Sequence, residues 1–75
     1  MNLRKRQVLD TALQLFTEKG FHNTSIQDIL GKAMISKGTF YNYFSSKTEC
    51  FMAILEQVRY EASLRRHELL DGNDP

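Results

Sequence analysis

A very short corner between two helical patterns constrains this chain more than any other feature of its sequence. Apolar residues recur at helical spacing from Ile26 to Ala33, and Ser36, a good helix N-cap, follows with only Met34 and Ile35 in between. Two residues are too few for anything except a tight turn between two packed helices. The spacing therefore predicts a helix-turn-helix motif.

Helical patterns also occupy the rest of the chain. The first runs over residues 4–19 and stops at Gly20, a residue suited to closing the last turn of a helix. Thr24 is the predicted N-cap of the second helix, because Gln27 three residues later completes a capping box, and Ser46 with Glu49 forms another before a longer fourth helix. We therefore expect an all-α fold, a three-helix bundle containing the helix-turn-helix and followed by the fourth helix.

The third helix, over residues 36–44, has two faces of different character. Its spacing points one aromatic set inward, namely Phe40, Tyr41 and Phe44, and leaves the other face with Lys37, Asn42 and Tyr43. Its first turn contains Gly38 and no bulky side chain. Such a helix can approach a base edge or a phosphate closely.

The charge of the chain is unevenly distributed. Its 75 residues carry a net charge of +1, but residues 1–48 hold seven basic and three acidic side chains, for a net +4, whereas residues 49–75 hold three basic and six acidic ones, for a net −3. A positive first portion suits a polyanion. The acidic last helix is expected to face away from it. Arg4, Lys5 and Arg6 form either a basic arm near DNA or a solvated helix start.

Several classes of protein are disfavoured by composition. The single cysteine, Cys50, has no partner for an internal disulfide, and His22 and His67 have no metal-ligand or catalytic arrangement around them, so we expect no metal, no cofactor and no enzyme. The longest apolar run is far shorter than the roughly 20 residues that span a bilayer, and no signal peptide is present. A cytoplasmic protein without a membrane segment is expected.

These features together closely resemble the N-terminal domain of the tetracycline-repressor (TetR) family. The resemblance covers about residues 4–55 and rests on Ala12, Leu15, Phe16, Gly20, Phe21, Thr24, Ile26, Asp28, Ile29, Ala33, Ile35, Ser36, Lys37, Gly38, Thr39, Tyr41, Tyr43, Phe44, Lys47 and Glu49. It implies a homeodomain-like three-helix unit over residues 1–48 whose third helix enters the major groove. It also implies that residues 49–75 begin the link to a ligand-binding and dimerisation domain that these 75 residues do not contain.

Two residues depart from the family pattern. Met34 stands where the family usually has glycine in the turn, and Leu30 stands where alanine is usual. Glycine at a turn between helices points to a backbone with positive φ, which costs a residue with a Cβ roughly 1 kcal/mol or more. We therefore expect Met34 to be strained.

The resemblance and the chemistry of the side chains together suggest specific DNA contacts. The candidates for base-edge contacts are Ser36, Lys37, Gly38 and Thr39, in the first turn of the reading helix. The candidates for phosphate contacts are Thr24, Tyr41, Asn42, Tyr43 and Lys47. Tyr41 has an alternative role as a core residue with its hydroxyl at the edge.

The expected function is sequence-specific binding of double-stranded DNA by a transcriptional regulator, most often a repressor in this family. It would act as a homodimer on a palindromic operator, with a small-molecule effector bound by the missing domain. The alternative is a helical protein-protein interaction module that docks through the aromatic cluster Phe40, Tyr41, Tyr43, Phe44 and Phe51.

Overall fold

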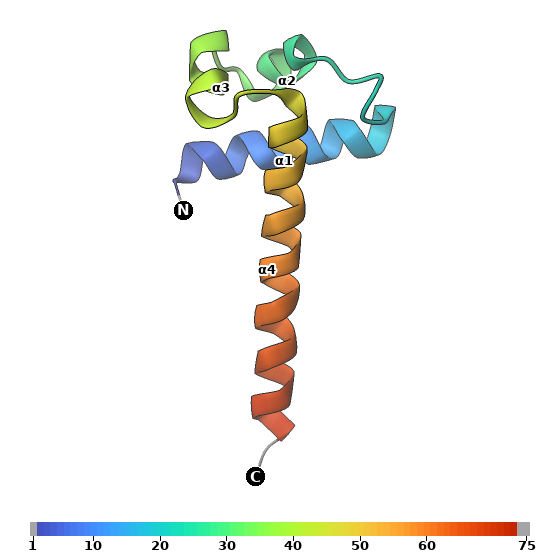
Figure 1. The fold of residues 1–75 in the computed structure, drawn as a ribbon, viewed down its shortest axis with the longest axis vertical. Coiled ribbons are helices and arrows are strands. Elements are labelled where there is room, and N and C mark those ends of the chain that lie inside the picture. The colour runs from blue at the N-terminus through green and yellow to red at the C-terminus, as the bar shows by residue number, and fades with distance from the viewer. Residues whose placement is uncertain (1, 74–75) are drawn as a thin grey trace.

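The protein is built from four α-helices. A computed structural model describes the backbone of residues 2–73 and the side chains of residues 2–65, and within that range it contains helices and turns without a strand. The helices are α1 (Leu3–Lys19), α2 (Ile26–Ala33), α3 (Lys37–Tyr43) and α4 (Lys47–Asn73), as Figure 1 shows. The predicted all-α fold with a longer fourth helix is confirmed.

Local sequence accounts for both ends of α1. The side chain of Asn2 caps the helix by accepting from the backbone N–H groups of Arg4 and Lys5, at 2.8 and 3.4 Å. At the other end Gly20 adopts a φ of 89°, and its N–H donates to the carbonyl of Phe16. A residue with a side chain is strained at that φ, so the glycine is needed to release the chain from α1.

The N-terminus of α2 lies one residue later than the capping box predicted from Thr24 and Gln27. Ser25 is the N-cap: its hydroxyl accepts from the N–H of Asp28 at 2.9 Å, and the Asp28 carboxylate accepts from the N–H of Ser25 at 3.0 Å. Thr24 is instead completely buried. Thr24 with Gln27 and Ser25 with Asp28 are chemically similar capping pairs. The burial of Thr24 leaves Ser25 as the N-cap.

The core is small and draws on all four helices. Its most buried side chains include Val8, Ala12, Ile29, Phe40 and Cys50, each with no exposed surface. Phe16 and Phe44, predicted as core residues along with Phe40, are 8% and 3% exposed. Because the core spans α1 to α4, the first turns of α4 belong to the same folded unit as the helix-turn-helix.

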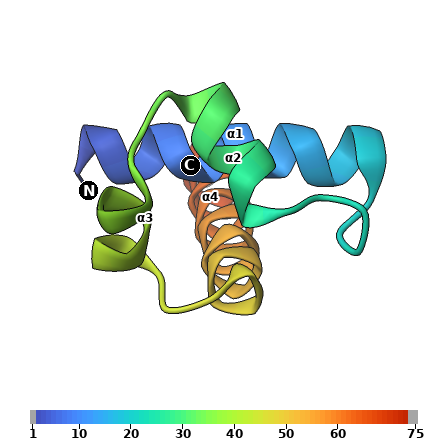
Figure 2. The ribbon, with the colours of Figure 1, turned by 90° about the horizontal axis from the view of Figure 1, so that it is seen from above.

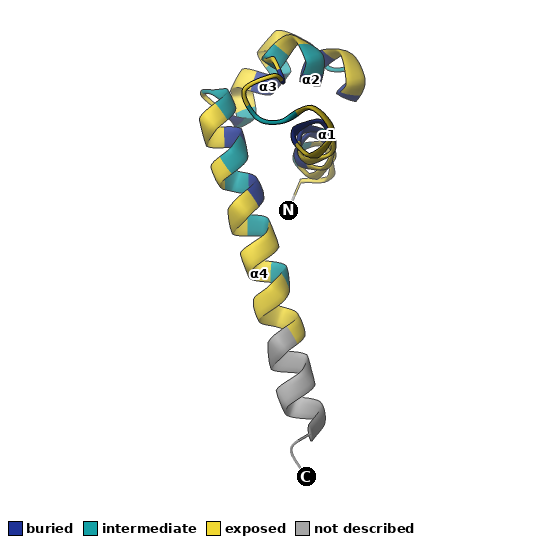
Figure 3. Cartoon of the chain, turned by 90° about the vertical axis from the view of Figure 1, so that its right-hand side faces the viewer, coloured by how far each residue is buried: buried dark blue, intermediate teal, exposed yellow. Residues whose placement is uncertain are grey.

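The last helix extends away from the rest of the molecule. Figure 1 shows α2 and α3 above α1 at one end and α4 running from them to the other end, and Figure 2, which looks down on α2 and α3, shows α4 beneath them. Figure 3 shows that the buried residues of α4 lie in its first turns, where Cys50 and Ile54 contact the core. The acidic helix therefore projects away from α3.

Candidate nucleic-acid interface

The turn between α2 and α3 has the strained conformation predicted for Met34. That residue has φ 56° and ψ 50°, in the left-handed region, and its N–H donates to the carbonyl of Leu30. Ile35 also donates to this carbonyl, at 3.1 Å, and its own side chain turns back toward the core. The Met34 side chain is 86% exposed, so packing does not compensate for its backbone strain.

Helix α3 is short and is held in place from one side. The Ser36 hydroxyl accepts from the N–H of Thr39 at 3.1 Å, which confirms Ser36 as the N-cap. Phe40 is completely buried, and its ring lies 5.5 Å from that of Phe44, which ends the helix in an extended conformation. Seven residues would not form a stable helix alone, so this aromatic anchor and the cap hold α3 on the core.

The first turn of α3 is open to a partner. Ser36, Lys37 and Gly38 are exposed and Thr39 is partly so. A Cβ added to Gly38 would meet only the Ser36 hydroxyl oxygen, at 3.9 Å, so nothing within the molecule requires a glycine there. The four predicted base-contact residues therefore form one accessible strip, in which the Ser36 and Thr39 hydroxyls share a hydrogen bond of 3.0 Å.

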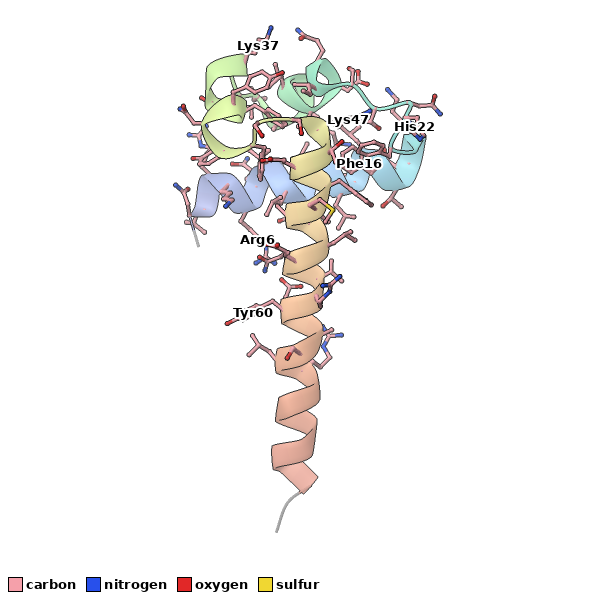
Figure 4. All side chains as sticks on the ribbon, viewed as in Figure 1. Arg6, Phe16, His22, Lys37, Lys47 and Tyr60 are labelled. Carbon is pink, nitrogen blue, oxygen red and sulfur yellow. The ribbon has the colours of Figure 1, made fainter. Side chains whose placement is uncertain are left out.

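Lys37 is the free positive charge of this strip. Figure 4 shows its side chain pointing from α3 away from α4. Among the described side chains, Lys37 takes part in no ion pair, whereas Lys19 pairs with Asp28 at 2.9 Å and Lys32 lies 4.0 Å from Glu18. An uncompensated ammonium at the exposed end of a helix suits a polyanion.

The remaining aromatic residues of α3 divide between surface and core. Tyr41 was predicted to face inward, but its side chain is 44% exposed, and it packs edge-on against Phe40 with the ring centroids 5.4 Å apart. Asn42 is exposed. Tyr43 is partly buried, and its ring centroid lies 6.2 Å from that of Phe44. Both tyrosines thus rest on the core while remaining partly open to solvent.

Thr24, a candidate for a phosphate contact, is buried and bonded within the molecule. Its side chain has no exposed surface, and its hydroxyl lies within hydrogen-bond distance of the carbonyls of Gly20 (2.8 Å) and Leu15 (3.2 Å). The hydroxyl therefore closes the loop after α1 rather than facing a partner. The family pattern identified this residue, but only the packing shows its role.

The N-terminus of α2 already has an anion. The Asp28 carboxylate accepts from the Ser25 N–H and from the Lys19 ammonium, and these two bonds, the backbone one first, lower its pKa to about 2. A phosphate approaching this turn would meet a carboxylate that is ionised at all physiological pH values. The first turn of α2 therefore already carries a negative charge of its own.

Lys47, another candidate for a phosphate contact, has its ammonium bonded within the molecule. Its ammonium donates to the carbonyls of Phe21 and Thr24, at 2.7 and 2.9 Å, and lies 4.3 Å from the centroid of the Phe21 ring. Two of its three donors are thus used within the molecule. No local pattern in the sequence indicates this contact, because 26 and 23 residues separate the partners.

Of the two alternatives for Arg4, Lys5 and Arg6, the structure shows the helix start. Residues 4–6 lie in the first turns of α1, where Arg6 pairs with Glu61 of α4 at 2.8 Å and with Asp10 at 3.5 Å. Lys5 lies over the Phe44 ring, 5.8 Å from its centroid. Arg6 thus contacts α4, and Lys5 contacts the residue that follows α3.

Metal and thiol chemistry have no site in the described part of the chain. Among the side chains of residues 2–65, no group of three or more His, Cys, Asp or Glu residues is placed to hold a metal ion, and His67 lies outside them. Cys50 is completely buried, which raises the pKa of its thiol to about 11 and keeps it protonated. Across the described helices, none is both long enough and apolar enough to cross a bilayer.

Comparison with known proteins extends this picture. Residues 8–54 match the family model for bacterial regulatory proteins of the tetR family. The chain is 42% identical over 55 residues to YuxN, an uncharacterized HTH-type transcriptional regulator of Bacillus subtilis (strain 168), a match that covers 73% of this chain and 19% of YuxN. It is 35% identical over 68 residues to the HTH-type transcriptional regulator UidR of Escherichia coli (strain K12), over 91% of this chain and 35% of UidR.

The fold has a counterpart among solved structures. The crystal structure of E. coli NemR in its reduced form matches 99% of this chain with a TM-score of 0.85 and 31% sequence identity. The match covers 38% of the NemR chain. The chain spans well under half the length of each of these three proteins.

Proposed function

The chain belongs to the tetR family of bacterial regulatory proteins, and we propose that it binds double-stranded DNA in a sequence-specific manner, with α3 in the major groove. Membership of this family makes the chain a DNA-binding regulator and not an enzyme. One observation carries the proposal for α3: its first turn is exposed and includes a lysine that forms no ion pair with the side chains of residues 2–65, while Phe40 anchors the helix from behind.

The base contacts come from Ser36, Lys37, Gly38 and Thr39. Lys37 suits the acceptor atoms of guanine, and the hydroxyls of Ser36 and Thr39 suit either donors or acceptors on base edges. Gly38 lets the backbone of α3 come close to the floor of the groove, because no side chain holds it away. Accessibility of all four residues supports this assignment.

The phosphate contacts come from Tyr41, Asn42 and Tyr43, near the end of α3. A phenol or amide on a helix lying in the groove can donate to a backbone phosphate and set the register of the protein. Tyr43 also has a ring that can pack against a thymine methyl group. Partial exposure supports both tyrosines, whereas the burial of Thr24 and the internal bonds of Lys47 count against those two.

A protein-docking role for the aromatic cluster has less support. Phe40 and Phe44 are core residues, and Phe51 packs against Phe16 and Phe21 with ring centroids 5.8 and 5.3 Å apart. The cluster is therefore mostly the interior of the domain. Only Tyr41, at 44% exposure, presents much surface to a partner.

The finer assignment follows the family. The chain would act as part of a cytoplasmic repressor that binds a palindromic operator as a homodimer, so that the two-fold symmetry of the protein matches that of the DNA. A small-molecule effector would bind in a further domain, since the matched relatives are much longer than this chain.

Titration with duplex DNA at several salt concentrations tests the central proposal. Binding through phosphates releases counterions, so the logarithm of the association constant falls linearly with the logarithm of salt concentration. We expect saturable binding with this dependence, and NMR shift changes centred on residues 36–43. No binding to any duplex at low salt would contradict the proposal, and shift changes centred elsewhere would contradict the role of α3.

A further inference from the structure

Lys47 links two segments of the chain that lie at opposite ends of the helix-turn-helix. It is the first residue of α4, directly after the segment that leaves α3, and its ammonium donates to the carbonyl of Thr24, directly before the N-cap of α2. Residues 25–46 contain the whole helix-turn-helix. One ammonium therefore joins the residue where the chain enters this motif to the residue where it leaves.

Within the loop itself, the Thr24 hydroxyl bonds to the carbonyls of Gly20 and Leu15, and none of these bonds reaches α4. The Phe21 carbonyl accepts from the Thr24 N–H at 3.3 Å and from the Lys47 ammonium at 2.7 Å. Among the hydrogen bonds of the described residues, the two from Lys47 are those that connect α4 to this loop. A bond from a charged donor is stronger than a neutral one, so these two contacts are a strong polar attachment beside the packing of the Phe21 and Phe51 rings.

Aromatic packing keeps the ammonium in this position. The Lys47 ammonium lies over the Phe21 ring, 4.3 Å from the ring centroid. The Phe21 ring in turn packs against Phe16 of α1 and Phe51 of α4, with ring centroids 5.3 Å apart in each pair. Lys47 is itself partly buried. Its placement beside the loop near His22, rather than beside Lys37, can be followed in Figure 4.

From this geometry we propose that Lys47 is a positioning residue for DNA binding, which closes residues 25–46 into a ring and so fixes α2 and α3 relative to α4. The inference rests on the proposed DNA-binding function. Without the two bonds, the start of α2 is no longer tied to the start of α4, and α3 loses part of its fixed orientation. Affinity then falls because the reading helix must be ordered on binding.

The decisive comparison is with a direct phosphate contact, which would also lower affinity when lost. Removing one phosphate contact reduces the slope of log K against log salt by about 0.9, whereas loss of positioning leaves the slope unchanged. Lys47→Met removes the charge and retains an apolar stem. Lys32→Met removes an exposed charge in the same way, outside the proposed contact set, and is the matched control.

For Lys47→Met we expect duplex affinity to fall by about tenfold, equivalent to roughly 1.4 kcal/mol, with an unchanged salt slope. Amide resonances of residues 21–25 and 44–47 should shift, and their hydrogen exchange should accelerate. Lys32→Met should leave these amides and the affinity unchanged within about twofold, roughly 0.4 kcal/mol. A slope reduced by about 0.9, or unaltered affinity in Lys47→Met, would overturn the proposal.

A measurement on the wild-type chain covers the case in which Lys47→Met does not fold. NMR of the Lys47 ammonium in the free protein should show slow proton exchange, and titration with a short duplex should leave its nitrogen shift unchanged. A large shift on DNA binding would show that the ammonium moves to a phosphate. If the wild-type chain binds no duplex, the proposed function fails, while amide exchange in Lys47→Met still reports whether Lys47 holds the loop.

Discussion

Met34 has a backbone conformation that favours glycine, although it carries a side chain. Its φ of 56° suits glycine, and its side chain, 86% exposed, makes too little contact with the core to offset the strain. The turn is nevertheless formed, because Leu30 accepts two backbone bonds there and α2 and α3 are both anchored in the core. The packed helices impose this conformation on the residue.

Met34→Gly should therefore be neutral to about 1 kcal/mol more stable, since relief of strain slightly exceeds the extra unfolded-state entropy of glycine. Urea unfolding measures this, with duplex affinity expected to stay unchanged. Met34→Ala is the control, because it removes the same side chain but keeps the Cβ, and it should show no such gain. If Met34→Gly unfolded at a lower urea concentration than both the wild type and Met34→Ala, the inference that Met34 is strained would be wrong.

Lys37 should affect discrimination between DNA sequences, since it lies in the proposed base-reading turn and has no partner among the described side chains. Lys37→Ala should cost about 1 to 3 kcal/mol on a preferred duplex selected from a random library, and much less on random DNA. Fluorescence anisotropy with both duplexes measures the ratio. Equal losses on the two would show that Lys37 contacts phosphate only.

At the scale of the element, the start of α2 depends on a charge network as well as a cap. The Asp28 carboxylate connects the Ser25 N–H to the Lys19 ammonium at the end of α1. Lys19 and Asp28 lie nine residues apart, across the loop between the two helices. The network therefore fixes both ends of that loop.

The lowered pKa of Asp28 predicts acid sensitivity. Because its pKa falls from 3.8 to about 2 on folding, the unfolded chain binds the proton more readily, so the stabilisation is complete above pH 3.8 and is lost as pH falls toward 2. Asp28→Asn should be less stable at neutral pH and should lose less stability over that window. Urea midpoints from pH 6 to about 2 measure this.

A matched control separates this effect from general acid unfolding. Asp10→Asn removes a carboxylate 3.5 Å from Arg6 in an exposed pair, which is expected to contribute little. It should follow the wild-type acid profile closely. The network would have no role if Asp28→Asn and Asp10→Asn gave the same profile as wild type.

At the scale of the whole molecule, the elongated shape separates the basic part of the chain from the acidic part. The chain measures 51 × 24 × 18 Å, with α3 near one end and α4 directed to the other. The first 48 residues carry a net +4 and the remainder a net −3. The charged halves thus favour approach to DNA with α3 in front and the acidic helix behind.

A two-fold arrangement on DNA predicts a gain from tethering. Two copies joined by a flexible linker should bind a duplex with two inverted half-sites at least about tenfold more tightly than a duplex with one, because the second contact becomes intramolecular. Titration of both duplexes measures the gain. A tandem with Lys37→Ala in one copy should lose it, and equal binding of both duplexes would contradict the palindromic site.

Much of this fold was predictable from local sequence. Ser36 as a cap, Gly20 as a stop, the tight turn at Met34 and the buried aromatic residues of α3 follow from interactions within a few residues of each other or from helical periodicity. The four base-contact candidates were also recognisable, because a bare first turn is a local pattern; their contacts with DNA stay predictions.

Other features required the tertiary structure. Thr24 and Ser25 offer overlapping caps, and only the contact of Thr24 with the carbonyls of α1 and its loop selects Ser25. The exposure of Tyr41 depends on how far α3 is turned on the core. Lys47 finds carbonyls 23 and 26 residues away. Sequence alone determined the helices and their turn, whose energetics are local, whereas packing between distant segments decided which polar groups remain free for DNA.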